Sequence, residues 1–152
     1  MTAPRETLPQ LAALLYRRRK ENASAVVSSG KMKCAQAMAH LRPWLAIACM
    51  VDADLPELAG RVSARMAGHE PVINETSARW LAADDICPRS IWAGVLAGAR
   101  DAAFDRFVKD SSLANAAAAR DLQRLCLALA YDPNGHSIPP YRAPVEGQAR
   151  AA

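Results

Sequence analysis

Apolar residues recur at intervals of three and four positions along most of this chain, and this spacing constrains its fold more than any other feature. Cys34, Met38, Leu41 and Leu45 illustrate it, because on a helix they form one buried stripe. Aromatic residues make up only 5% of the chain, and the alternations of β-branched and aromatic residues that are typical of strands are absent. Ala and Leu, which favour helices, are frequent among the apolar residues. We therefore predict an all-α fold.

Interruptions of this spacing at Pro, Gly and Asp predict a compact single-domain bundle of five to seven helices. The expected helices span residues 8–21, 31–51, 55–67, 76–84, 88–109 and 113–131. Thr7, Asp54 and Ser112 lie where caps are expected. Pro43 predicts a kink in the second helix, or two helices that meet near Arg42.

The end of the sequence differs in composition from the expected helices. Residues 136–152 contain three prolines and have little to bury. We therefore expect a helical domain of residues 1–135, followed by an extended or disordered, flexible C-terminal tail of residues 136–152.

The stretch from Ser90 to Ala99 contains no charged residue. A surface helix shows polar side chains in every turn, so this stretch predicts a central helix that the others surround. Gly94 and Gly98 share one face of it, and each costs about 1 kcal/mol relative to Ala inside a helix. We expect the pair to allow close backbone packing.

The recognisable catalytic motifs are absent. No glycine-rich phosphate loop, nucleophile elbow or H-E-x-x-H pair occurs. The four cysteines lie too far apart for a common metal site or disulfide framework, and their apolar neighbours predict buried, reduced thiols. Asp84 and Asp85 fit the end of a short helix better than an acid–base pair, and His69 fits a helix end. We therefore expect a non-enzymatic protein without a cofactor or a metal.

The sequence lacks both a membrane span and a signal peptide, and these two absences indicate the cellular location. No apolar run approaches the ~20 residues of a membrane span. The short apolar run near the first helix is followed, not preceded, by basic residues, which is unlike a signal peptide. We expect a cytoplasmic protein that does not enter a membrane.

Positive charge is concentrated in the first third of the chain. Residues 1–50 carry eight Lys or Arg and two Glu, a net charge of +6, whereas residues 51–152 carry eleven Lys or Arg and thirteen Asp or Glu, a net charge of −2. Four cations occupy residues 17–20, at the expected end of the first helix, and Lys31 and Lys33 begin the second. Antiparallel packing of the two helices would gather about six charges at one end, and phosphate backbones are common partners of such a patch.

The candidate nucleic-acid-binding residues comprise these cations and two Arg pairs on later helices. They are Arg17, Arg18, Arg19, Lys20, Lys31, Lys33, Arg42, Arg61, Arg65, Arg120 and Arg124. Only Tyr16 and Trp44 lie near enough in sequence to stack on bases, so contacts to the backbone of RNA or single-stranded DNA are expected instead of base readout.

In its size, helical character and basic surface, the chain resembles the small helical subunits of CRISPR effector complexes. This architectural resemblance implies a non-enzymatic subunit of a bacterial nucleoprotein complex. It further implies contact with RNA or a displaced strand alongside other protein subunits and copies of the chain itself. A phage or plasmid accessory protein fits the same features equally well.

Two other functions are compatible with the sequence. A helix-turn-helix DNA-binding regulator of phage or plasmid type would use residues 76–97, and Arg89 would then contribute more to binding than Arg18. A protein-interaction or dimerisation module without nucleic-acid binding would instead use the region of Trp80 and Trp92, or the face that carries the two glycines.

Overall fold

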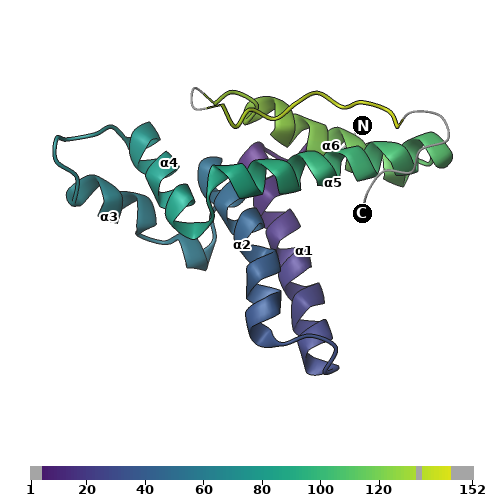
Figure 1. The fold of residues 1–152 in the computed structure, drawn as a ribbon, viewed down its shortest axis with the longest axis horizontal. Helices are drawn as coiled ribbons and strands as arrows, with labels where there is room; N and C mark the ends of the chain where they lie inside the picture. The colour runs from purple at the N-terminus through teal and green to yellow at the C-terminus, as the bar shows by residue number, and fades with distance from the viewer. Residues whose placement is uncertain (1–4, 133–134, 145–152) are drawn as a thin grey trace. The chain divides into compact units, whose positions relative to one another are not determined.

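The computed structural model describes residues 5–132 and 135–144, and in these residues all regular secondary structure is helical (Figure 1). The elements are α1 (Leu8–Ser28), α2 (Cys34–Met50), the 3-10 helix η1 (Pro56–Leu58), α3 (Arg61–Ala67), α4 (Glu75–Ile86), α5 (Arg89–Lys109) and α6 (Leu113–Ala128). The all-α class and the predicted number of helices are confirmed for the described residues. The chain forms two compact units, Met1–Trp92 and Ala93–Ala152, which divide inside α5.

In the first unit, α1 and α2 form an antiparallel hairpin (Figure 1). Thr7 caps α1 as predicted: its hydroxyl accepts a hydrogen bond from the Gln10 amide at 3.3 Å, and the Gln10 side chain accepts one from the Thr7 amide at 2.9 Å. The helix continues to Ser28, so the predicted end at residue 21 is wrong. The added turns form because Val26 and Val27 continue the apolar spacing and are half-buried.

The second helix of the hairpin, α2, is a single helix with Pro43 inside it, so the expectation of two helices is wrong. Leu41 and Leu45 are buried as predicted, but Cys34 is exposed and Met38 is 49% exposed. The predicted stripe is therefore wrong in its first half. That half lies in the outer part of the hairpin, which extends away from α3 and α4 (Figure 1).

The C-terminal end of α2 closes with a left-handed residue. The backbone of Asp52 has φ 59°, its amide donates to the carbonyl of Cys49 at 3.1 Å, and the amide of Ala53 donates to the carbonyl of Ala48 at 3.0 Å. These two bonds form a Schellman motif, which satisfies carbonyls that the helix leaves without partners.

The single helix expected at residues 55–67 is wrong, because the chain forms η1 and α3 instead. Gly60 separates them with φ 76°, a left-handed conformation that other residues rarely adopt. Leu55 begins η1 in an extended conformation without a side-chain cap, so Asp54 does not cap it as predicted. Gly68 ends α3, as predicted.

Two short-range caps hold α4 and the start of α5. The side chain of Asn74 accepts a hydrogen bond from the Ser77 amide at 2.8 Å and caps α4, which packs against α2 and α3. The carboxylate of Asp84 accepts one from the Arg89 amide at 3.2 Å, directly after Pro88. Asp84 therefore has a structural role at this turn.

The prediction that residues 90–99 form a surrounded helix is wrong. Trp92 and Leu96 are buried, but Ile91 is 52% exposed, and Gly94 and Gly98 lie on the surface. A Cβ atom at either glycine would meet no atom within 4 Å, so the expected close packing is absent. The stretch lacks charge because small and apolar residues occupy its exposed positions.

In the second unit, α6 begins at Ser112, whose hydroxyl accepts a hydrogen bond from the Asn115 amide at 3.2 Å as a predicted cap. The thiol of Cys126 in α6 donates to the carbonyl of Leu96 in α5 at 3.9 Å. The buried residues of α6 are Ala119, Leu122, Leu125 and Cys126, with Leu129 buried just beyond it.

Residues 135–144 contain no helix but are tied to α5 and to the end of α6. Ile138 is buried, and its amide donates to the carbonyl of Ala130 at 3.0 Å. The ring of Tyr141 stacks on Phe104 with centroids 4.8 Å apart, and its hydroxyl donates to Asp105 at 2.8 Å. Ile138 and Tyr141 therefore anchor this otherwise exposed part, and residues 145–152 lie outside the described residues.

Candidate nucleic-acid interface

The predicted basic cluster at residues 17–20 lies in the middle of α1. Within it, Arg19 packs between α1 and α2. The guanidinium of Arg19 lies 3.5 Å from the ring centroid of Trp44 on α2, and it donates to the carbonyl of Leu15 at 3.3 Å. Burial lowers the pKa of Arg19. This cation–π contact joins the two helices, so Arg19 is not presented to a partner.

The neighbouring cations contact the loop after α2. Lys20 forms an ion pair with Glu57 at 2.9 Å, and this hydrogen bond raises the pKa of Lys20. Arg17 donates to the carbonyl of Asp54 at 3.5 Å. Arg18 is exposed and forms no ion pair in the described part of the chain, so the cluster presents fewer free cations than its sequence predicts.

The expected joining of this cluster with Lys31 and Lys33 is wrong. The helix α1 extends ten residues beyond Arg18, to Ser28, which is a rise of about 15 Å. Lys31 and Lys33 lie beyond that point, in the turn between α1 and α2, and both are exposed. The basic residues of the hairpin therefore form two separate groups. Arg42 is exposed on α2.

Two other candidates of the first unit have partners within the chain. Arg65 forms a two-pronged ion pair with Asp85, with Nε–Oδ2 at 2.8 Å and Nη2–Oδ1 at 3.2 Å. Arg61 donates to the carbonyl of Glu57 at 2.8 Å. Arg65 in particular joins α3 to α4, so its main role is structural.

The last predicted pair, Arg120 and Arg124, belongs to the second unit. Both lie near the carboxylate of Asp121, at 4.0 and 3.9 Å. These loose surface pairs contribute little to stability.

The turn between α1 and α2 contains a site that the sequence analysis missed. Lys33 occupies the N-cap position of α2, where its ammonium group cannot accept a hydrogen bond from the first turn. The amides of Cys34, Ala35 and Gln36 consequently have no acceptor within the described residues, and all three residues are exposed. Together with the side chains of Lys31 and Lys33, these amides form what we call the hairpin tip.

The electrostatics of the hairpin tip favour an anion. Free amides and the helix dipole place partial positive charge at a helix N-terminus, and two ammonium groups add to it here. The hairpin as a whole, residues 8–50, carries seven Lys or Arg and a single carboxylate, that of Glu21. A sequence signal for this site exists: Lys33 stands where Ser, Thr, Asp or Asn normally precedes a helix.

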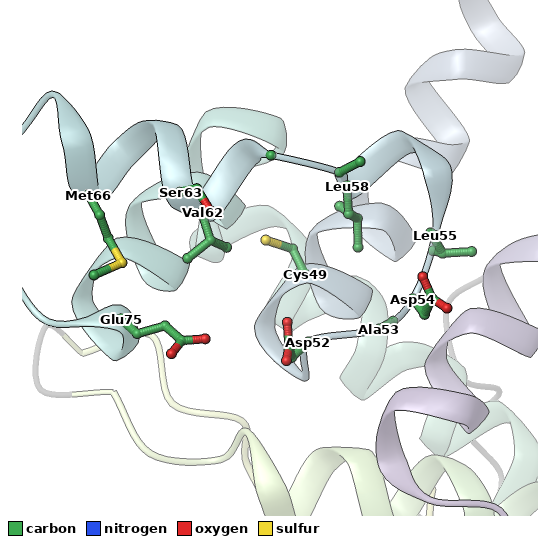
Figure 2. A pocket seen from close by; sticks show the side chains of 12 residues that line it. Cys49, Asp52, Ala53, Asp54, Leu55, Leu58, Val62, Ser63, Met66 and Glu75 are labelled. Atoms are coloured by element: carbon green, nitrogen blue, oxygen red, sulfur yellow. The ribbon is translucent and has the colours of Figure 1, made fainter.

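At the other end of α2 a groove of about 580 Å³ opens between the Schellman motif, η1 and α3. Its apolar lining includes Leu55, Leu58 and Val62, and its carboxylates include Asp52 and Asp54. Figure 2 shows Leu58 and Val62 on the side of η1 and α3, with Asp52 facing them from the end of α2. The groove therefore combines apolar side chains with carboxylates, and two of these carboxylates lie beside the end of α2.

The predicted helix-turn-helix residue Arg89 does not reach the surface. It is 7% exposed, and its guanidinium lies 4.9 Å from the ring centroid of Trp80 and 4.7 Å from that of Trp92. A side chain held between two aromatic rings is not placed to read base edges. The turn between α4 and α5 is also shorter than expected, with Cys87 and Pro88 between the helices.

Comparisons with known proteins identify no relative. No protein-family model matches the chain, and neither the curated proteins nor the solved structures contain a match. Among the described residues, no helix has both the length and the apolar character needed to cross a bilayer.

Proposed function

We propose that this protein is a non-enzymatic helical subunit that binds the sugar–phosphate backbone of RNA or single-stranded DNA through the hairpin tip, as part of a larger nucleoprotein assembly. The observation that carries this proposal is the N-terminus of α2, which directly follows Lys31 and Lys33 and receives no hydrogen bond from a capping side chain at Lys33. Free amides and neighbouring ammonium groups suit a phosphate, because both can donate hydrogen bonds to its charged oxygens.

The two lysines of the hairpin tip also lower the stability of α2. Lysines at a helix N-terminus have the wrong sign for the macrodipole, which costs about 0.3–1 kcal/mol each at low salt. A lysine at the N-cap further forgoes the about 0.5–2 kcal/mol that a capping side chain contributes. Departures from local rules are common at functional sites, so this cost supports a role in binding.

Binding to labelled single-stranded RNA and DNA at two salt concentrations tests the proposal. If the tip neutralises about three phosphates, affinity falls roughly 20-fold between 50 and 200 mM salt. Replacing both tip lysines, Lys31→Gln with Lys33→Gln, should lower affinity at least tenfold at 50 mM salt. It should also reduce the slope of log K against log salt by about 1.4, because two phosphate contacts are lost.

The matched control is Arg106→Gln with Lys109→Gln. These two cations are exposed at the end of α5, so their loss lowers the net charge equally and leaves the tip intact. The proposal predicts near-normal binding by this control. Equal loss in both variants would show attraction by net charge alone and contradict the proposed site.

A competitor distinguishes phosphate from other polyanions. Poly-glutamate carries carboxylates at high density but no phosphate, and it represents an acidic protein partner. We expect it to displace RNA far less well than unlabelled RNA of equal charge. Equal displacement would contradict a nucleic-acid function.

A further inference from the structure

The helix α2 carries charges of the wrong sign for its dipole at both ends. Lys31 and Lys33 flank its positive N-terminus, and Asp52 and Asp54 follow its negative C-terminus. Each pair adds to the partial charge of the helix terminus beside it. The hairpin therefore has a positive tip and a negative end at the groove. The lysines are repelled by the partial positive charge at the N-terminus of α2, and the aspartates by the partial negative charge at its C-terminus.

These two ends cannot neutralise each other within one chain. The helix between them has 17 residues and spans about 25 Å, and it packs against α1 and α4. Beyond a Debye length of about 8–10 Å, charges on the surface are largely screened. Only another molecule can bring a positive tip to a negative groove.

The groove leaves its two aspartates available for such a contact. Its third carboxylate, Glu75, is paired with Arg79 at 3.1 Å. The nearby Arg17 donates to the backbone carbonyl of Asp54 at 3.5 Å and forms no ion pair with its carboxylate in the described part of the chain. Within the described residues, the carboxylates of Asp52 and Asp54 form no ion pair.

The hairpin tip also matches the groove in its apolar content. Met32 lies between the two tip lysines, so the turn presents an apolar side chain flanked by two cations. The groove presents Leu55, Leu58 and Val62 beside the carboxylates of Asp52 and Asp54, and its volume lies within the roughly 300–1,000 Å³ of ligand pockets. Both surfaces combine two like charges with apolar side chains, and the signs of the charges are opposite.

We propose that the groove binds the hairpin tip of a second copy of this chain, so that copies associate head to tail. This inference goes beyond the proposed function, because it gives the tip a second partner that competes with nucleic acid. The contact joins two different surfaces of the molecule, so it extends to chains of copies unless the rotation between neighbours closes a ring.

Sedimentation velocity of the full chain without nucleic acid, at 50 mM salt and from about 1 μM to 1 mM protein, tests the association. The wild type should increase in mass with concentration and dissociate as salt rises. Asp52→Asn with Asp54→Asn should raise the dissociation constant at least tenfold, and Asn tolerates the left-handed backbone at residue 52. A wild type that stays monomeric, or variants that associate normally, would overturn the inference.

A charge exchange between two variants gives a sharper test. Lys31→Glu with Lys33→Glu makes the tip acidic, and Asp52→Asn with Asp54→Lys makes the groove basic. Each variant alone should be monomeric, because its tip and groove have the same sign. Their equimolar mixture should associate, because each tip then meets a groove of opposite sign. A mixture that stays monomeric while both variants give native circular dichroism would refute the pairing.

Failure of this inference and failure of the proposed function are distinguishable. The variant Asp52→Asn with Asp54→Asn keeps the tip intact, so it should bind RNA within about twofold of the wild type or slightly better. RNA binding that depends on the tip lysines without any association would reject the inference alone. Association without RNA binding would reject the proposed function alone.

Discussion

Replacing Lys33 with Asp should stabilise the first unit and weaken nucleic-acid binding at the same time. The residue has φ −77° and ψ 151°, which is the extended geometry of an N-cap. An Asp side chain there can accept a hydrogen bond from the free amides of the first turn. The same change removes one of the two ammonium groups of the hairpin tip.

The size of the stabilisation follows from two contributions. An N-cap side chain contributes about 0.5–2 kcal/mol, typically near 1. Reversal of the charge beside the helix N-terminus adds about 0.3–1 kcal/mol at low salt. A total of about 1–2 kcal/mol in a unit of 92 residues corresponds to a rise in Tm of roughly 5–10 °C.

Urea unfolding followed by circular dichroism measures the change, with the RNA assay run on the same preparations. Lys33→Gln is the control, because it removes the charge without supplying a strong cap, and it should gain only the smaller contribution. Affinity should fall in both variants. If Lys33→Asp is no more stable than Lys33→Gln, the first turn of α2 already has a cap and the reasoning about the tip is refuted.

Three further outcomes can be checked. A thiol reagent at pH 8 should modify only the exposed Cys34 in the folded protein, because burial raises the pKa of the other three thiols, to about 11 for Cys126; modification of several thiols at once would contradict this burial. Tyr141→Phe should lower the free energy of unfolding by about 1 kcal/mol, because the hydrogen bond to Asp105 is lost while the ring remains, and an unchanged urea midpoint would show that the bond contributes nothing. Asp52→Gly should raise the free energy of unfolding by about 0.5–1 kcal/mol, because glycine adopts a left-handed backbone without strain, and a lower Tm would contradict the Schellman geometry.

The parts of the fold that the sequence predicts well are those that depend on near neighbours. The caps at Thr7 and Ser112 and the start of α5 after Pro88 involve residues within five positions, and all three were predicted. The division of residues 55–67 was not predicted, because the helical spacing of the apolar residues Leu58, Val62 and Met66 continues across Gly60. Only the left-handed conformation of that glycine separates η1 from α3.

The candidate site shows the same limit. A sequence shows how densely charges lie along the chain, but not which of them find partners. Trp44 lies 25 positions from Arg19, and Glu57 lies 37 positions from Lys20, and no local pattern connects either pair. The hairpin tip is hard to predict for a different reason. It depends on the lack of a capping residue at Lys33, and a count of charges along the chain does not reveal a missing cap.

The outer part of the hairpin has one more consequence. Between residues 21 and 40 only Ala37 is buried, so the two helices of this arm contact little besides each other. Removing seven residues from each helix would preserve the facing sides, since seven residues are close to two turns, and would shorten the arm by about 10 Å. The reach of the tip is thus a property that insertions and deletions can adjust in steps, without repacking the body that carries it.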